Sequence, residues 1–147
     1  MNRVTAFILG VATVLAPFTA LGCGGGGGKD GGGGGAGGDP AVANDLKQIG
    51  LAYHSYNDKY RGKGPPNAEA LQEFLGGNIA AYQALKDGRY VFLWNARLLD
   101  NVGGPEVVLA YQKDVPSQGG LVLFMDGSTR NLTADEFKSA RLAKAKS

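Results

Sequence analysis

The sequence predicts an α+β domain, in which an N-terminal amphipathic helix packs on a small antiparallel sheet and a C-terminal helix follows. Between Pro40 and Tyr60 apolar residues recur every three or four positions, which is the period of a helix. Later segments are rich in β-branched and aromatic residues, and an Asp126-Gly127 pair follows one of them, which is typical of a hairpin. The domain occupies residues 39–147, after two segments of a different kind.

The first 22 residues have the pattern of a secretory signal peptide. Arg3 supplies a positive charge near the start, and an apolar run follows it as far as residue 21. A retained membrane anchor is the alternative interpretation. Pro17 and the marginal length of the apolar run both disfavour a spanning helix, so we expect a cleaved leader, residues 1–22.

The leader ends in Ala20-Leu21-Gly22-Cys23, which resembles a lipobox, the site recognised in bacterial lipoprotein precursors. The resemblance implies that the peptide is cut before Cys23 and that this cysteine carries an acyl group. We therefore expect the lipid to hold the protein at the cell membrane or the outer membrane, where it faces the periplasm or the cell exterior.

Residues 23–38 consist of this cysteine and an almost pure glycine segment. Glycine has no side chain to bury and the largest backbone entropy to lose, so the segment predicts a disordered tether. Its r.m.s. span would be roughly 20–25 Å, enough to lift a domain clear of lipid head groups. A phosphate-binding loop is not expected, because no strand precedes the glycines and Gly-Lys-Ser/Thr is absent.

Three helices are expected in the first half of the domain, over residues 40–60, 68–75 and 79–87. Asp39, Asn67 and Asn78 stand immediately before them and can cap their free N–H groups. Pro40 suits the first helical position, where its missing N–H costs nothing.

Three strands are expected next, over residues 89–95, 106–112 and 121–126. The Asp126-Gly127 pair predicts a two-residue type I′ turn with positive φ at both residues. Thr133 and Glu136 make a capping box that predicts a final helix from Ala134 to about residue 144. Because the strands are apolar on both faces, we expect this helix and residues 79–87 to cover the face that the first helix leaves open.

Composition excludes several kinds of site. Cys23 is the only cysteine, so the domain has no disulfide, thiolate metal site or cysteine nucleophile. His54 is the only histidine and falls beside the apolar stripe of the first helix, so we do not expect catalysis by it. A net charge of +2 disfavours a nucleic-acid binder. No enzymatic activity, cofactor or metal is expected.

One strand suggests an alternative, ligand-binding function. Its alternation places Tyr90, Phe92 and Trp94 on one face, where an exposed row would grip a peptide or a carbohydrate. A covered row would instead belong to the core. Three tyrosines of the first helix share the helical stripe and are expected in the core: Tyr53, Tyr56 and Tyr60.

Two stretches resemble a bacterial family with a pseudopilin-like fold, catalogued as domain of unknown function 1559 and related to the type II secretion major pseudopilin. The first is residues 44–56, with Asp58, Tyr60 and Pro65-Pro66 after it, and the second is the hairpin of residues 121–130. The family has no settled biochemical activity, so the resemblance implies a fold and no reaction. Typical members carry a prepilin cleavage site and a long apolar helix, where this chain has a lipobox and a glycine tether. No filament assembly is therefore expected.

These observations predict a non-enzymatic, membrane-anchored envelope lipoprotein that displays a pseudopilin-like domain for protein interaction or a structural role. Its expected partners are the membrane, through the acyl group on Cys23, and an envelope protein. The alternative is a peptide- or carbohydrate-binding surface lipoprotein that uses the strand face of Tyr90, Phe92 and Trp94.

Overall fold

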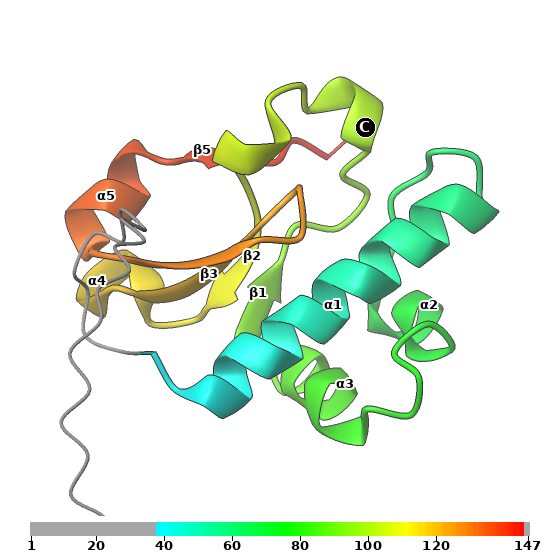
Figure 1. Cartoon of the computed structure of the whole chain (residues 1–147), viewed down its shortest axis with the longest axis horizontal. Helices are drawn as coiled ribbons and strands as arrows, with labels where there is room; N and C mark the ends of the chain where they lie inside the picture. The colour runs from blue at the N-terminus through cyan, green and yellow to red at the C-terminus, as the bar shows by residue number, and fades with distance from the viewer. Residues whose placement is uncertain (1–37, 146–147) are drawn as a thin grey trace, which may run out of the picture. The chain divides into compact units, whose positions relative to one another are not determined.

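The computed structural model describes residues 38–145 and confirms a mixed α+β fold (Figure 1). The predicted leader, Cys23 and the tether up to residue 37 lie outside the described residues. The helices are α1 (Pro40–Lys59), α2 (Ala68–Gln72), α3 (Ile79–Lys86), α4 (Val115–Gln118) and α5 (Ala134–Ser139), with 3₁₀ turns η1 (Leu98–Asp100) and η2 (Gly104–Glu106). The strands are β1 (Tyr90–Phe92), β2 (Val107–Gln112), β3 (Gly120–Phe124), β4 (Thr129–Leu132) and β5 (Arg141–Leu142).

The predicted helix starts are confirmed by their caps. The Asp39 carboxylate accepts a hydrogen bond from the N–H of Ala41, and Pro40 opens α1. The side-chain oxygens of Asn67 and Asn78 likewise accept from the third residue of α2 and of α3. Each cap satisfies an N–H that the first turn of a helix leaves without a partner.

The sheet is mixed and not purely antiparallel as predicted. Strands β1, β2, β3 and β4 are neighbours in that order, and all three pairings are antiparallel. Strand β5 pairs with the first half of β2 in parallel, whereas β1 pairs with its second half. Since β3 occupies one edge of β2, β1 and β5 share the other.

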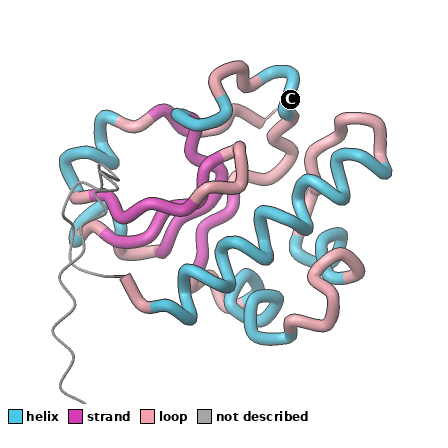
Figure 2. The backbone as a smooth tube through the Cα atoms, viewed as in Figure 1, coloured by secondary structure: helices cyan, strands magenta, loops and turns pink. Residues whose placement is uncertain are grey.

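Helices cover both faces of the sheet. Figure 2 shows the strands between one group of helices, α1 to α3, and a second group, α4 and α5. Helices α1, α2 and α3 contribute to one core with residues of the sheet, including Leu46, Ala84 and Leu123. The prediction that residues 79–87 cover the second face is therefore wrong, because α3 packs beside α1. The second face is covered by α4 and α5, in a smaller cluster of Val108, Val115, Val122, Phe124 and Phe137.

A β-bulge in β2 distributes its side chains between these two cores. The pairing with β3 shifts register between Val108 and Ala110. Leu109 and Ala110 consequently both belong to the core under α1. Tyr111 then faces α5, where its ring centroid lies 4.6 Å from that of Phe137. The extra residue of a bulge is what resets the alternation of a strand.

The hairpin turn between β3 and β4 differs from the predicted type I′ turn. Gly127 has a φ of +84°, but Asp126 does not share the left-handed conformation. The Gly127 N–H donates to the Phe124 carbonyl at 3.0 Å, and the Phe124 N–H donates to the Ser128 carbonyl at 2.8 Å. These bonds close a three-residue loop that ends in a left-handed glycine. The Asp126 carboxylate accepts from the N–H of Ser128 at 2.9 Å, which stabilises the turn from the side.

The predicted final helix is too long. The capping box of Thr133 and Glu136 is confirmed, but α5 ends at Ser139 and Ala140 is extended. The chain then pairs with the free edge of β2, and the Ala143 N–H donates to the Val108 carbonyl at 2.8 Å. This pairing satisfies backbone groups of β2 that a longer helix would leave without partners.

Candidate functional site

Trp94, Phe92 and Tyr90 do not form an exposed row. Only 6% of Tyr90 and 4% of Phe92 is exposed, and Trp94 lies beyond the end of β1 with its ring centroid 4.4 Å from that of Phe92. The ring of Tyr53, on α1, lies over Phe92 at 6.1 Å. The row belongs to the core, so this strand face is not available as the alternative ligand site.

The polar ends of the two buried tyrosines join elements of the fold. The Tyr90 hydroxyl donates to the Asp45 carboxylate at 3.1 Å, and the Asn78 amide donates to the other oxygen of Asp45 at 3.4 Å. Burial, together with the negative charge of Asp45, raises the pKa of Tyr90 to about 12. The Tyr53 hydroxyl donates to the Ala96 carbonyl at 3.0 Å, and burial raises the pKa of Tyr53 as well. These contacts hold α1 to β1, to α3 and to the loop after β1.

His54 lies against the hairpin turn. Its imidazole Nε2 is 3.8 Å from the place where a Cβ on Gly127 would be, and its ring meets that of Tyr53 edge-on at 5.4 Å. In the part of the chain that the structure describes, no group of three or more His, Cys, Asp or Glu side chains could hold a metal ion. None of the described helices is both long and apolar enough to cross a bilayer.

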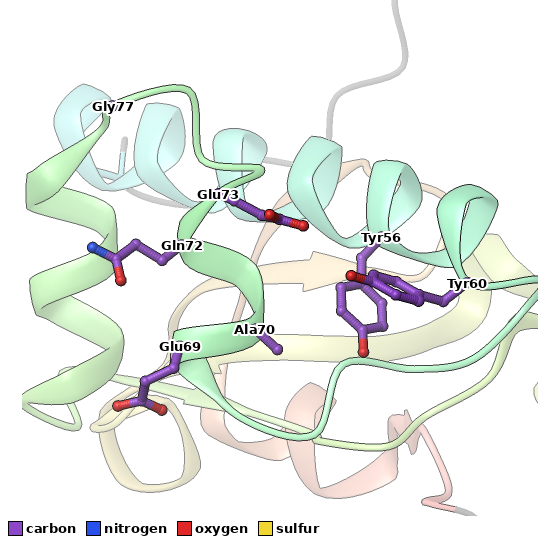
Figure 3. A pocket seen from close by; sticks show the side chains of 7 residues that line it. All are labelled: Tyr56, Tyr60, Glu69, Ala70, Gln72, Glu73 and Gly77. Carbon is purple, nitrogen blue, oxygen red and sulfur yellow. The ribbon is translucent and has the colours of Figure 1, made fainter.

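An open groove of about 710 Å³ lies between the last turns of α1 and α2 (Figure 3). Its lining residues are Tyr56, Tyr60, Glu69, Ala70, Gln72, Glu73 and Gly77. The prediction that all three α1 tyrosines are in the core is therefore only partly right. Tyr53 is fully buried, Tyr56 is half-buried, and 39% of Tyr60 is exposed. The end of α1 runs past the sheet and lies beside α2 (Figure 1).

Three aromatic rings form a cluster beside this groove, which we call the aromatic cage: Tyr56, Tyr60 and Phe74. Their centroids are separated by 4.4, 5.5 and 6.3 Å. The Lys59 ammonium lies 5.0 Å from the centroid of Phe74 and 5.4 Å from that of Tyr60. It also donates to the Glu73 carboxylate at 2.7 Å, a hydrogen bond that raises the pKa of Lys59. Rings and carboxylate together are a favourable setting for a cation.

A second lysine repeats this arrangement at the other side of α2. The Lys86 ammonium donates to the Glu69 carboxylate and lies 6.0 Å from the ring centroid of Tyr82. Their hydrogen bond lowers the pKa of Glu69 and raises that of Lys86. A small apolar hollow of about 140 Å³ adjoins the groove, since both are lined by Gln72 and Gly77. The lining of this hollow is completed by Leu75, Asn78, Ile79 and Tyr82.

Sequence reasoning missed Phe74 and the two carboxylates of the groove. The sequence places Glu69, Glu73 and Phe74 within the predicted helix of residues 68–75. What it did not reveal is that Glu73 meets Lys59 of α1, whereas Glu69 meets Lys86 of α3. No protein-family model, curated protein or solved structure matches the chain.

Proposed function

We propose that this protein is a non-enzymatic envelope lipoprotein that holds a pseudopilin-like domain at a membrane for contact with another protein. The observation that carries the proposal is the Ala20-Leu21-Gly22-Cys23 sequence at the end of an apolar leader. Glycines follow it up to Gly38, and the described fold begins at once with the Asp39 cap of α1. Anchor, tether and domain thus follow one another in the order that display at a surface requires.

The packing of α1 supports the pseudopilin-like part of the proposal. Both stretches that carry the resemblance lie in contact, because α1 crosses the hairpin of β3 and β4 (Figure 1). Gly50 permits this close approach, since a Cβ at Gly50 would lie 3.1 Å from a methyl group of Leu123. An N-terminal amphipathic helix packed on a small sheet is what the resemblance implies. The lipid and the tether replace the assembly helix of such proteins, so the proposed domain acts without forming a filament.

The anchor is tested by acylation of Cys23. The wild-type protein should incorporate labelled palmitate and remain with the membrane fraction, whereas Cys23→Ser should not be labelled. Ala36→Ser places the same new side chain in the glycine segment and should be labelled like the wild type. Equal labelling of the wild type and Cys23→Ser would contradict the lipoprotein proposal. If the wild type is labelled and Cys23→Ser is not, chemical cross-linking of the acylated protein in its own envelope would identify the protein that it contacts.

A second candidate function is peptide binding, and the groove between α1 and α2 is the observation that favours it. It offers exposed ring surface at Tyr60 beside two carboxylates, Glu69 and Glu73. This location replaces the strand face of Tyr90 and Phe92, which is buried. Peptide binding at the groove is compatible with display of the domain for protein contact.

A further inference from the structure

We propose that the aromatic cage beside the groove between α1 and α2 binds a lysine side chain of a partner protein, and that Lys59 occupies this position when the partner is absent. That the partner is a protein depends on the proposed function. The chemistry of the bound group is argued from the groove and the cage alone.

The chain already shows which group the aromatic cage accepts. The Lys59 ammonium lies within 5.4 Å of two ring centroids and within hydrogen-bond distance of Glu73. Cations are attracted to the faces of aromatic rings, and cages of such rings recognise quaternary and methylated ammonium groups in other proteins. A neutral sugar would stack on a ring but would bring no charge for the carboxylate. The observed contacts therefore favour an ammonium ligand over a carbohydrate.

Lys59 is held loosely enough to be replaced. About half of its side chain, 52%, is exposed, and so is 56% of the side chain of Glu73. Exposed ion pairs of this kind stabilise proteins little, because water screens them and the long side chains lose entropy. The flexible four-carbon stem of lysine lets its ammonium move into solvent without any movement of the helix. An incoming ammonium can then make the same contacts with Tyr60, Phe74 and Glu73.

The surroundings of the cage fit a polypeptide. Beyond Gln72 and Gly77 the groove meets the apolar hollow lined by Leu75, Ile79 and Tyr82, and the side chain of Ile79 is exposed. A segment with a lysine and a nearby apolar residue could fill both parts. Glu69 adds a second carboxylate at the rim, where its exposed pair with Lys86 can be exchanged in the same way.

The test uses the protein as extracted from its membrane into detergent micelles, with its six tyrosines replaced by 3-fluorotyrosine. The probe is Nα-acetyl-lysine methylamide, and Nα-acetyl-norleucine methylamide is the matched probe without the ammonium. The lysine probe should shift the ¹⁹F signals of Tyr56 and Tyr60 in a saturable way. The signal of Tyr111, which packs on the other face of the sheet, should not move. The buried Tyr53 signal reports that each variant is folded.

Two variants separate the cage from general charge effects. Lys59→Met removes the internal competitor and should strengthen binding of the lysine probe by roughly fivefold. Lys47→Met removes the same charge from an exposed position of α1 and should leave the affinity unchanged. Glu73→Gln and Tyr60→Leu should each weaken binding.

Three outcomes would overturn the proposal. The first is a norleucine probe that shifts the two signals as strongly as the lysine probe. The second is an affinity that Lys59→Met does not change. The third is a shift of the Tyr60 signal by maltohexaose without any shift by the lysine probe, which would make the groove a carbohydrate site. Absence of palmitate on Cys23 would affect none of these readouts, so failure of the anchor and failure of the groove are distinguishable.

Discussion

Removal of the Asn101 side chain should release the C-terminal segment from the rest of the domain. Only 3% of Asn101 is exposed, and its amide makes three hydrogen bonds. Its oxygen accepts from the Lys144 N–H at 2.7 Å, and its nitrogen donates to the carbonyls of Arg97 at 2.8 Å and Lys144 at 3.2 Å. Asn101→Ala removes all three bonds and leaves backbone groups of both segments without these partners.

The expected loss follows from the number of bonds and from where their partners lie. A buried hydrogen bond contributes about 1 kcal/mol net, so three bonds give a first figure of about 3 kcal/mol. Lys144 is close to the end of the described chain and can turn outward to water, which recovers part of this free energy. We therefore expect Asn101→Ala to lower the free energy of unfolding by about 2 kcal/mol.

Two measurements check this prediction. Denaturant unfolding gives the loss of stability, and hydrogen exchange should show a local effect at the Ala143 N–H, which donates to the Val108 carbonyl. Exchange at Ala143 should accelerate more than exchange in the centre of β3. Asn44→Ala, at an exposed position of α1, is the control and should change neither quantity much. Unchanged protection at Ala143 with a stability loss under about 0.5 kcal/mol would refute the reasoning.

Two further predictions concern the hairpin and the buried tyrosines. Gly127→Val should lower the free energy of unfolding by about 1–2 kcal/mol, because φ is +84° at this position. Gly127→Asn should cost less, since asparagine tolerates this conformation better. An unchanged melting curve for the valine variant would show that the turn does not need a positive φ. Tyr90 ionises less readily in the folded state, so its raised pKa contributes stability that is complete below pH 10.0, the ordinary value, and is lost as the pH rises to about 12. In an alkaline absorbance titration Tyr90 and Tyr53 should ionise last, together with unfolding, and Tyr90→Phe should remove one late step. Ionisation of all six tyrosines before any loss of helical circular dichroism would contradict this assignment.

Local chemistry explains which elements could be predicted. The caps by Asp39, Asn67 and Asn78 and the capping box of Thr133 each join residues at most three positions apart, so the sequence alone specifies them. The stripe of α1 was predictable for the same reason, since helical periodicity brings its residues to one side. The turn at Asp126 was predicted in the right place but with the wrong conformation. Its loop length depends on how Phe124 and Ser128 pair across the hairpin.

The groove could not be predicted to the same degree. Periodicity placed Tyr53, Tyr56 and Tyr60 on one side of a helix, but it does not say what packs against each turn. In the fold the sheet covers Tyr53, whereas α2 and Phe74 stand beside the other two rings. Contacts between Lys59 and Glu73 therefore exist only because the loop after α1 brings α2 back beside it.

What the sequence by itself determined is the order of the parts: an apolar run before Cys23, a glycine segment after it, then capped helices and then strands. These features depend on composition and on interactions within a turn of chain. Tertiary structure alone decided the position of α3 beside α1, the ending of α5 at Ser139 and the pairing of β5 with β2. Each of these depends on a free edge or an uncovered face that only the assembled sheet presents. Burial of apolar surface and pairing of backbone N–H and C=O groups at these places stabilise the fold more than local helix preference does. The chain therefore adopts the conformation that the assembled sheet favours.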